Sequence, residues 1–187
     1  MVAAAVVAVA VLRPAADAPP ATPTAPTAAA RAAAAAANDF GFRLLAAQRA
    51  GRAGNVLVSP TSLSMALAMT WNGAAGATRE GMARALGIAG LDAEALNAGQ
   101  RDLLATLRTA DPAVELTLAN ALWVQRGFPL RTLFIHVNRQ YYDARVTETD
   151  VTGDAGVREV NAWVAEATRR KITTLLKPGD LDPLTRL

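Results

Sequence analysis

Apolar residues recur along this chain with two periods, one helical and one typical of strands. Spacings of three and four residues predict amphipathic helices, and strict alternation predicts a strand with one buried face. The stretch VELTLANALWVQ alternates and predicts a strand over 114–125, with Asn120 as the polar member of its apolar face. Shorter strands are predicted over 55–58 and 144–150. Helices are predicted from Asn38 to just before Gly51, from Pro60 to Trp71, from Thr78 to just before Gly87, over 92–108, from Pro129 through Tyr141 and over 155–168.

The helix predicted from Pro60 begins in the unusual stretch VSPTSLSM, where hydroxyl residues interrupt an apolar run. Ser59 is placed to act as the N-cap, and a proline suits the first turn because its missing N–H costs nothing there. A buried helix start needs hydroxyl groups to satisfy its free backbone donors, which gives Ser59 and Ser62 a structural reason. One face of this helix carries Leu63, Ala66, Leu67, Thr70 and Trp71, and Met65, Ala68 and Met69 cover much of the rest, so we expect it to be buried nearly all round. The helix after Pro129 carries Leu130, Leu133, Phe134, Val137 and Tyr141 on its apolar face.

The first 37 residues differ in composition from the rest of the chain. MVAAAVVAVAVL is too short to span a bilayer but fits the hydrophobic region of a signal peptide, although the usual positive start is missing. Residues 14–30 are rich in proline, alanine and threonine, which predicts a disordered linker. We therefore expect a leader and linker over 1–37, irregular or detached, and a folded part over 38–187, with the alanines at 32–37 able to extend the first helix backwards.

Composition excludes several kinds of chemistry. The chain has no cysteine and one histidine, His136, whose apolar helical surroundings favour a structural or surface role. No G-x-S-x-G, H-E-x-x-H, P-loop or G-x-G-x-x-G motif occurs, so we expect no enzyme, no metal site and no cofactor. Net charge is +3, and the only tight basic triplet, residues 169–171, suits a solvated helix end rather than nucleic acid.

Three separated motifs, in the correct order, resemble the N-terminal half of the serpin family of serine protease inhibitors. NVLVSPTSLSMALAMTWNGAAGATREGMARAL is similar to the family's N-terminal motif, LTLANALWVQ to the second strand of its large sheet, and VNAWVAEATRRKITTLL to the helix across that sheet. Arg145 and Arg170 depart from the usual pattern without disturbing the match. The matching residues include Asn55, Ser59, Pro60, Ser62, Ala66, Leu67, Gly73, Thr78, Asn120, Asn161, Trp163, Thr168 and Lys171.

This resemblance implies an α+β chain: the N-terminal helices and first strands of a multi-domain α/β serpin fold, truncated and incomplete without its C-terminal half. Ser59, Pro60 and Ser62 would belong to the polar cluster called the shutter, with Asn161 close by on the overlying helix. Since family members are roughly twice as long, downstream strands would be missing. One edge of the strand over 114–125 would then stay unpaired, and the isolated chain would be prone to aggregation.

The function implied by the resemblance is inhibition of a serine, or alternatively cysteine, protease by insertion of a cleaved reactive loop into the large sheet. The loop and its hinge would lie beyond residue 187, so the 187 residues are not expected to inhibit alone. A non-inhibitory serpin-like protein with a binding or structural role remains the alternative, and only the hinge sequence would separate the two. The complete protein is expected to be an exported monomer, extracellular or in the cell envelope, without a stable membrane span.

Overall fold

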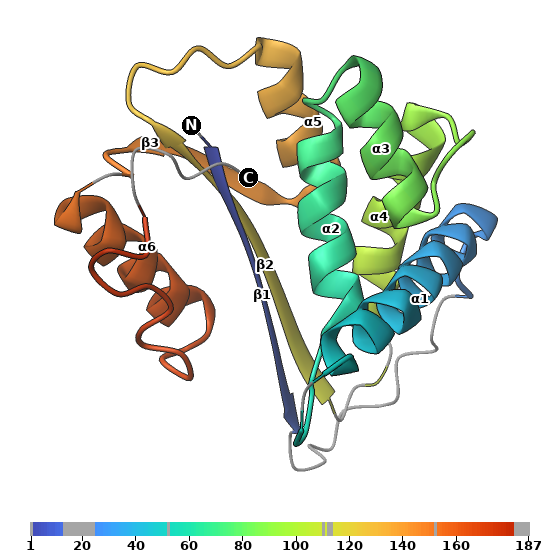
Figure 1. Ribbon diagram of the computed structural model, residues 1–187, viewed down its shortest axis with the longest axis horizontal. Coiled ribbons are helices and arrows are strands. Elements are labelled where there is room, and N and C mark those ends of the chain that lie inside the picture. Colours follow the sequence, from blue (N-terminus) through green and yellow to red (C-terminus); the bar gives the residue numbers. More distant parts are fainter. Residues whose placement is uncertain are drawn as a thin grey trace.

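The computed structural model describes residues 2–12, 25–51, 53–109, 111, 114–151 and 153–181. Helices and strands alternate irregularly along this part of the chain (Figure 1). In chain order the elements are β1 (Val2–Leu12), α1 (Ala28–Arg49), α2 (Pro60–Trp71), α3 (Gly76–Leu86), α4 (Ala93–Arg108), β2 (Val114–Gln125), α5 (Thr132–Tyr142), β3 (Ala144–Thr149) and α6 (Asp154–Ala167).

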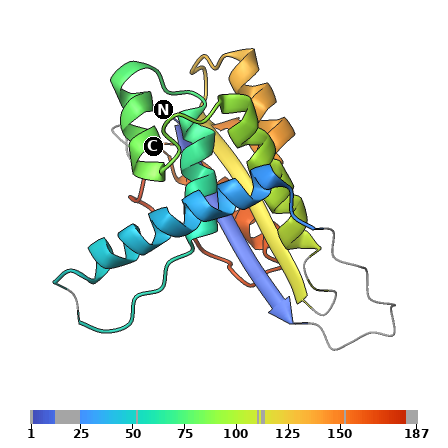
Figure 2. The ribbon, with the colours of Figure 1, turned by 90° about the vertical axis from the view of Figure 1, so that its right-hand side faces the viewer.

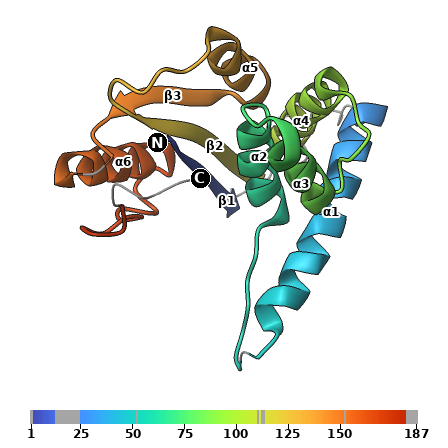
Figure 3. The ribbon, with the colours of Figure 1, turned by 45° about the horizontal axis from the view of Figure 1, so that its top comes forward.

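A three-stranded sheet in the order β1-β2-β3 forms the centre of the molecule. β1 runs antiparallel to β2, from the pair Val2–Val124 to the pair Leu12–Val114. β3 runs parallel to β2, from Asn120–Ala144 to Gln125–Thr149. The long central strand β2 is therefore paired along both edges, as Figure 3 shows from above.

Helices cover both faces of β2. Leu122 packs with residues of α2 and α5, and Leu118 packs with Met65 of α2 and with α4. On the opposite face, Ala121 and Trp123 pack against α6. Figure 1 shows α6 on one side of the sheet and α2 on the other. The predicted strand over 114–125 is confirmed, but both of its faces are buried where only one was expected.

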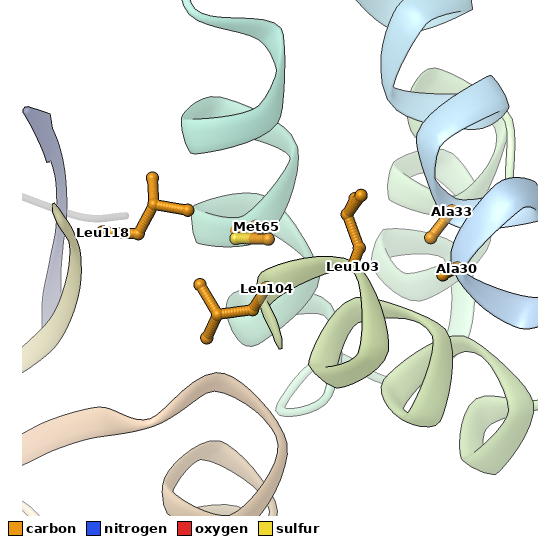
Figure 4. Close-up of a cluster of buried hydrophobic side chains, with 6 residues drawn as sticks. All are labelled: Ala30, Ala33, Met65, Leu103, Leu104 and Leu118. Atoms are coloured by element: carbon orange, nitrogen blue, oxygen red, sulfur yellow. The ribbon is translucent and has the colours of Figure 1, made fainter. Parts of the chain in front are cut away.

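The core beside α1 is made of small and medium side chains. Figure 4 shows Met65, Leu103, Leu104 and Leu118 meeting between α2, α4 and β2, with Ala30 and Ala33 of α1 closing the cluster. Alanine on α1 lets this helix approach α4 closely. Gly99 of α4 allows the same approach, since a Cβ there would lie 2.6 Å from the Ala29 carbonyl oxygen.

The first helix begins ten residues earlier than the Asn38 start that the sequence predicts. Alanine has the highest helix propensity, and the Thr27 side chain caps the first turn by accepting a hydrogen bond from Ala30 N at 3.0 Å. Burial of Ala30 and Ala33 then fixes the extended helix against α4. The helix includes the alanines at 32–37, as the sequence allowed, and the expectation of an irregular chain is wrong for residues 28–31.

The expectation of a detached leader is also wrong for the residues of β1, because they lie in the sheet. The open edge expected for β2 is paired with this strand within the described residues. Most of the proline-rich stretch lies outside the described residues. Whether residues 1–37 also act as a signal and linker stays a prediction.

Two further expectations need correction. Residues 55–58 form no strand, and Leu57 is 97% exposed, because no neighbouring strand lies beside them in the described part of the chain. α5 begins at Thr132 rather than at Pro129, and its Leu133 is 71% exposed. Asn138 and Tyr142 are the buried residues of α5, and Phe134 and Tyr141 of the predicted face pack beside them against the core.

Candidate functional site

The first turn of α2 holds the serines on which the sequence prediction rests. Ser59 occupies the N-cap position with an extended backbone (φ −110°, ψ 94°), as predicted. Its side chain makes no capping hydrogen bond; the Ser59 hydroxyl donates instead to Ser62 Oγ at 2.9 Å. Ser59 is exposed and Ser62 is buried. The predicted capping bond is therefore wrong, and the serines form a side-chain pair that crosses from surface to core.

Ser64 is a buried hydroxyl that the sequence interpretation passed over. It donates to the Thr61 carbonyl at 3.1 Å, within the same first turn. Leu63 of the predicted α2 face is 39% exposed, while Met65, Ala68 and Met69 are buried. The helix is buried nearly all round, as predicted, with Leu63 as the exception: its methionines face the sheet, while Leu67 and Trp71 pack in a separate cluster. A helical wheel phased on the methionines would have found Ser62 and Ser64 together.

Pro60 occupies the first position of α2, and its ring contacts α1. Figure 2 shows α1 running past the start of α2. A Cβ on Gly41 of α1 would overlap the Pro60 ring, so only glycine permits this approach. Pro60 therefore has two roles: its ring starts α2, and it contacts the neighbouring helix.

Asn161 lies on α6 and binds the chain that follows this helix. Its Oδ1 accepts from Leu175 N at 2.8 Å and Leu176 N at 2.9 Å, and its Nδ2 donates to Leu176 O at 2.7 Å. The sheet stands between α6 and α2 (Figure 1). Asn161 is therefore not beside Ser59 and Ser62, as the resemblance implied, and its amide binds the loop through three hydrogen bonds.

Asn120 on β2 belongs to a different polar cluster, at the other end of α2. Its Nδ2 donates to the Tyr142 carbonyl at 2.6 Å. The Tyr142 hydroxyl donates to Asn97 Oδ1 at 2.6 Å, and the amides of Asn97 and Asn72 exchange hydrogen bonds at 2.9 and 3.1 Å. Burial raises the pKa of the Tyr142 hydroxyl well above its usual range, against a smaller lowering by Asn72. This cluster joins β2, α2, α4 and α5.

The remaining motif residues on α6 are structural. Trp163 packs edge-on against Trp123, with ring centroids 6.1 Å apart. Thr168 is the buried C-cap, and its hydroxyl donates to Val164 O at 2.7 Å and accepts from Ile172 N at 3.0 Å. Lys171 is exposed, as are Arg169 and Arg170, which fits the solvated helix end predicted for this triplet. Arg145 lies with its guanidinium 5.5 Å from the Trp123 ring centre.

The motif residues around α2 and α3 divide between surface and core. Asn55 and Thr78 are exposed, and Ala66 is half-buried. Leu67 packs at the edge of the cluster formed by Trp71, Leu86, Ile88 and Leu96. At Gly73 a Cβ would lie 2.9 Å from the Phe134 ring, so glycine lets α5 approach the end of α2.

Sites for other chemistry are few. Within the described residues, no group of three or more histidine, cysteine, aspartate or glutamate side chains could hold a metal ion. None of the helices described combines the length and hydrophobicity needed to cross a membrane. His136 is exposed on α5, in agreement with its predicted surface role.

Comparison with known proteins identifies a family to which this chain is similar. The sequence model of the family described as serpin (serine protease inhibitor) matches residues 35–187. An uncharacterized serpin-like protein of Thermococcus kodakarensis is 39% identical over 154 residues, which are 80% of this chain and 35% of that protein. The leukocyte elastase inhibitor of Bos taurus is 34% identical over 137 residues, which are 72% of this chain and 36% of that protein.

Solved structures agree with the sequence matches. The thermophilic serpin tengpin, in its latent state, superposes with a TM-score of 0.69 at 29% identity, covering 80% of this chain and 39% of the other. The chain therefore belongs to the serpin family and has a partial α/β serpin fold. It spans little more than a third of the length of the two curated relatives named above. Proteins of this family are in general protease inhibitors rather than enzymes.

Proposed function

We propose that this chain is the N-terminal part of a serine protease inhibitor that acts by the suicide-substrate, loop-insertion route. The family match over residues 35–187 carries the proposal. The central strand β2, buried between α2 and α6, supplies the sheet into which a cleaved loop would insert. A cysteine protease is the second kind of target. The reactive loop itself, by resemblance, belongs to sequence beyond residue 187.

Within this function we assign Ser59, Pro60 and Ser62 to the shutter that lies under the moving sheet. The Ser59–Ser62 hydrogen bond supports this assignment, because it joins the two hydroxyls into one polar pair at the start of α2. Asn161 would act separately, by holding the loop after α6 against that helix. We further propose that the complete protein is a monomer exported to the cell envelope or the extracellular space, with no nucleic-acid partner.

The test begins with the coding sequence downstream of the Leu187 codon. If it encodes the rest of a serpin, the complete protein is incubated with trypsin-like, subtilisin-like and papain-like proteases and run on a denaturing gel. A covalent complex supports the proposal, and the 187-residue chain is the matched negative control. A frame that encodes no C-terminal half, or a complete protein that is cleaved without trapping any protease, overturns it.

The same experiment separates the non-inhibitory alternative. Insertion of a cleaved loop as an extra strand adds a full row of backbone hydrogen bonds, so an inhibitory protein should melt at a higher temperature after cleavage. An unchanged melting temperature after cleavage favours a non-inhibitory binding or structural role.

A further inference from the structure

The turn that follows α6 carries three consecutive cations on a strained backbone. Arg169 and Arg170 have φ values of 48° and 61°, in the left-handed region that residues other than glycine rarely adopt. Each such residue costs free energy, which the surrounding structure has to offset. Lys171 follows directly, and all three residues are exposed. The turn therefore presents basic side chains on a backbone that loses strain when it opens.

Hydrogen bonds to the end of α6 keep this turn closed. The backbone N–H groups of residues 169, 170 and 171 donate to the carbonyl oxygens of Glu166, Ala165 and Thr168, at 3.1, 2.6 and 3.0 Å. Backbone hydrogen bonds at a helix end open more readily than those in the core of a protein, because the helix does not continue beyond them. Strain at two neighbouring residues lowers the cost of this opening further.

Side chains hold the segment that comes after the turn. From residue 171 to residue 181 the described chain forms no helix or strand. Asn161 of α6 binds the backbone of residues 175 and 176 through three hydrogen bonds. Ile172, Leu176 and Leu181 pack, partly buried, against the core cluster that contains Trp123. The turn at 169–171 can therefore open while the segment after it stays bound to the rest of the molecule.

Most other lysines and arginines lie where a protease cannot bind the backbone. In the part of the chain that the structure describes, most arginines lie within helices or in β3, while the cations outside helices and strands are Arg126, Arg131, Lys177 and the triplet. Arg126 N donates to Thr149 O of β3 at 3.0 Å, and the Arg131 carbonyl accepts from Ile135 N of α5 at 3.2 Å. Pro178 follows Lys177 and restricts the backbone at that bond. The triplet is thus the most accessible basic site among these.

We propose that residues 169–171 are a cleavage site for a protease that recognises arginine and lysine. A protease binds the chain around the bond it cuts in an extended conformation, so the turn has to open first, and the rate of cutting follows the population of the open form. Hydrolysis adds one water across the peptide bond, leaving a carboxylate on one residue and an amine on the next. Asn161 still holds the segment after the cut, so the two pieces separate only on denaturation. The proposal does not rest on protease inhibition, because here the chain is a substrate.

Limited digestion of the full chain with trypsin tests the site. Fragments are separated on a denaturing gel, and their masses give the rate of cutting at each bond. Cutting within 169–171 is expected to be about tenfold faster than cutting after Arg126 or Arg131, because the turn opens more often. The triple variant Arg169→Gln, Arg170→Gln, Lys171→Gln should lose these fragments. It should keep the slow cuts after Arg126 and Arg131, which report that the variant is folded.

Two substitutions at Arg170 isolate the effect of strain. Arg170→Gly and Arg170→Ala remove the same cation, but only glycine adopts a φ of 61° without strain. Both variants keep the bond after Lys171 as a site. Cutting there should be about fivefold slower in Arg170→Gly than in Arg170→Ala, because the closed turn is more stable with glycine. Asn161→Ala should instead speed the cut, since it frees the segment that follows the turn.

Two results would overturn the proposal. One is cutting after Arg126 or Arg131 as fast as within the triplet, and the other is an equal rate after Lys171 in the glycine and alanine variants. The outcome is also separable from the test for inhibition. A complete protein that carries the three glutamines lacks this site, so its failure to trap a protease would count against inhibition alone.

Discussion

At Gly41 the absence of a side chain decides how two helices meet, because a Cβ there would overlap the Pro60 ring. The sequence predicted Pro60 as a helix start but contained no signal that Gly41 would face it, since glycine inside a helical pattern reads only as a weak helix former. Ser59 shows the opposite case. Its position at the helix start was predictable from VSPTS, while its hydrogen-bond partner depended on the rotation of α2, which is set by packing against the sheet.

Gly41→Ala should destabilise the chain by about 1–3 kcal/mol, because either the Pro60 ring or the whole of α1 must move. Gly81→Ala is the matched control, since it also lies inside a helix but has nothing within 4 Å of its would-be Cβ. That change should stabilise the chain by about 0.5–1 kcal/mol through helix propensity. Urea unfolding of the two variants measures both values, and a similar response at the two glycines would contradict the Pro60 contact.

Tyr142 predicts a pH effect. Burial raises the pKa of its hydroxyl in the folded state, so the folded protein keeps the proton longer than the unfolded chain. The stability from this group is fully present below the unfolded pKa of about 10 and declines as the pH rises above that value. Unfolding curves at pH 8 to 11 should show the decline, and Tyr142→Phe should remove it. Tyr141→Phe, which changes the neighbouring half-buried ring, should leave it in place.

At the level of elements, α4 and α6 were the most predictable. Asp92 caps α4 as expected, with its carboxylate accepting from Glu94 N and Ala95 N, and Gly87 ends α3 in the left-handed conformation. Such local signals involve neighbours in the chain. α2 is buried nearly all round, as predicted, and Phe134 and Tyr141 of the face predicted for α5 pack on the core. Leu63 and Leu133 are the exceptions, because tertiary contacts leave some residues of an apolar face exposed. The strand predicted over 55–58 failed for the related reason that a strand exists only beside a partner.

Asn161→Ala should release the loop after α6, because it deletes three hydrogen bonds to residues 175 and 176. Amide hydrogens of Leu175 and Leu176 should exchange faster, while the rest of α6 keeps its protection. Asn161→Asp retains both acceptor contacts and loses only the donor, so its effect should be smaller. If both variants leave the two amides protected, the loop is held by other contacts and the assignment is wrong.

For the whole molecule, the sequence motifs identified the family but not the use of its first residues. A short apolar segment at an N-terminus predicts a leader by its composition. No signal in the neighbouring residues distinguishes such a leader from a strand of the same composition. The strand assignment comes from pairing with β2, more than a hundred residues away, and a role of the same residues as a leader stays a prediction. Contacts of such sequence separation are invisible to pattern reasoning. They are also why the extent of the folded part was underestimated at Asn38.

The whole 187-residue chain should form no covalent complex with trypsin- or subtilisin-like proteases, because by resemblance its reactive loop lies beyond residue 187. Denaturing gels after incubation with each protease measure this directly, with a complete inhibitory serpin as the positive control. A stable covalent complex of this chain with a protease would show that a reactive peptide bond lies within the 187 residues. It would contradict their assignment to the N-terminal part of a serpin.

The run of six alanines at 32–37 within α1 has a genetic consequence. Repeats of one amino acid are often encoded by repeated codons, which gain or lose units during replication. Each alanine gained or lost would rotate everything after it by about 100° relative to the Thr27 cap. Gly41 would then leave the Pro60 ring, and a bulkier neighbour would take its place. The number of alanines therefore fixes the direction in which Gly41 faces, and adding or deleting one alanine should break its contact with Pro60.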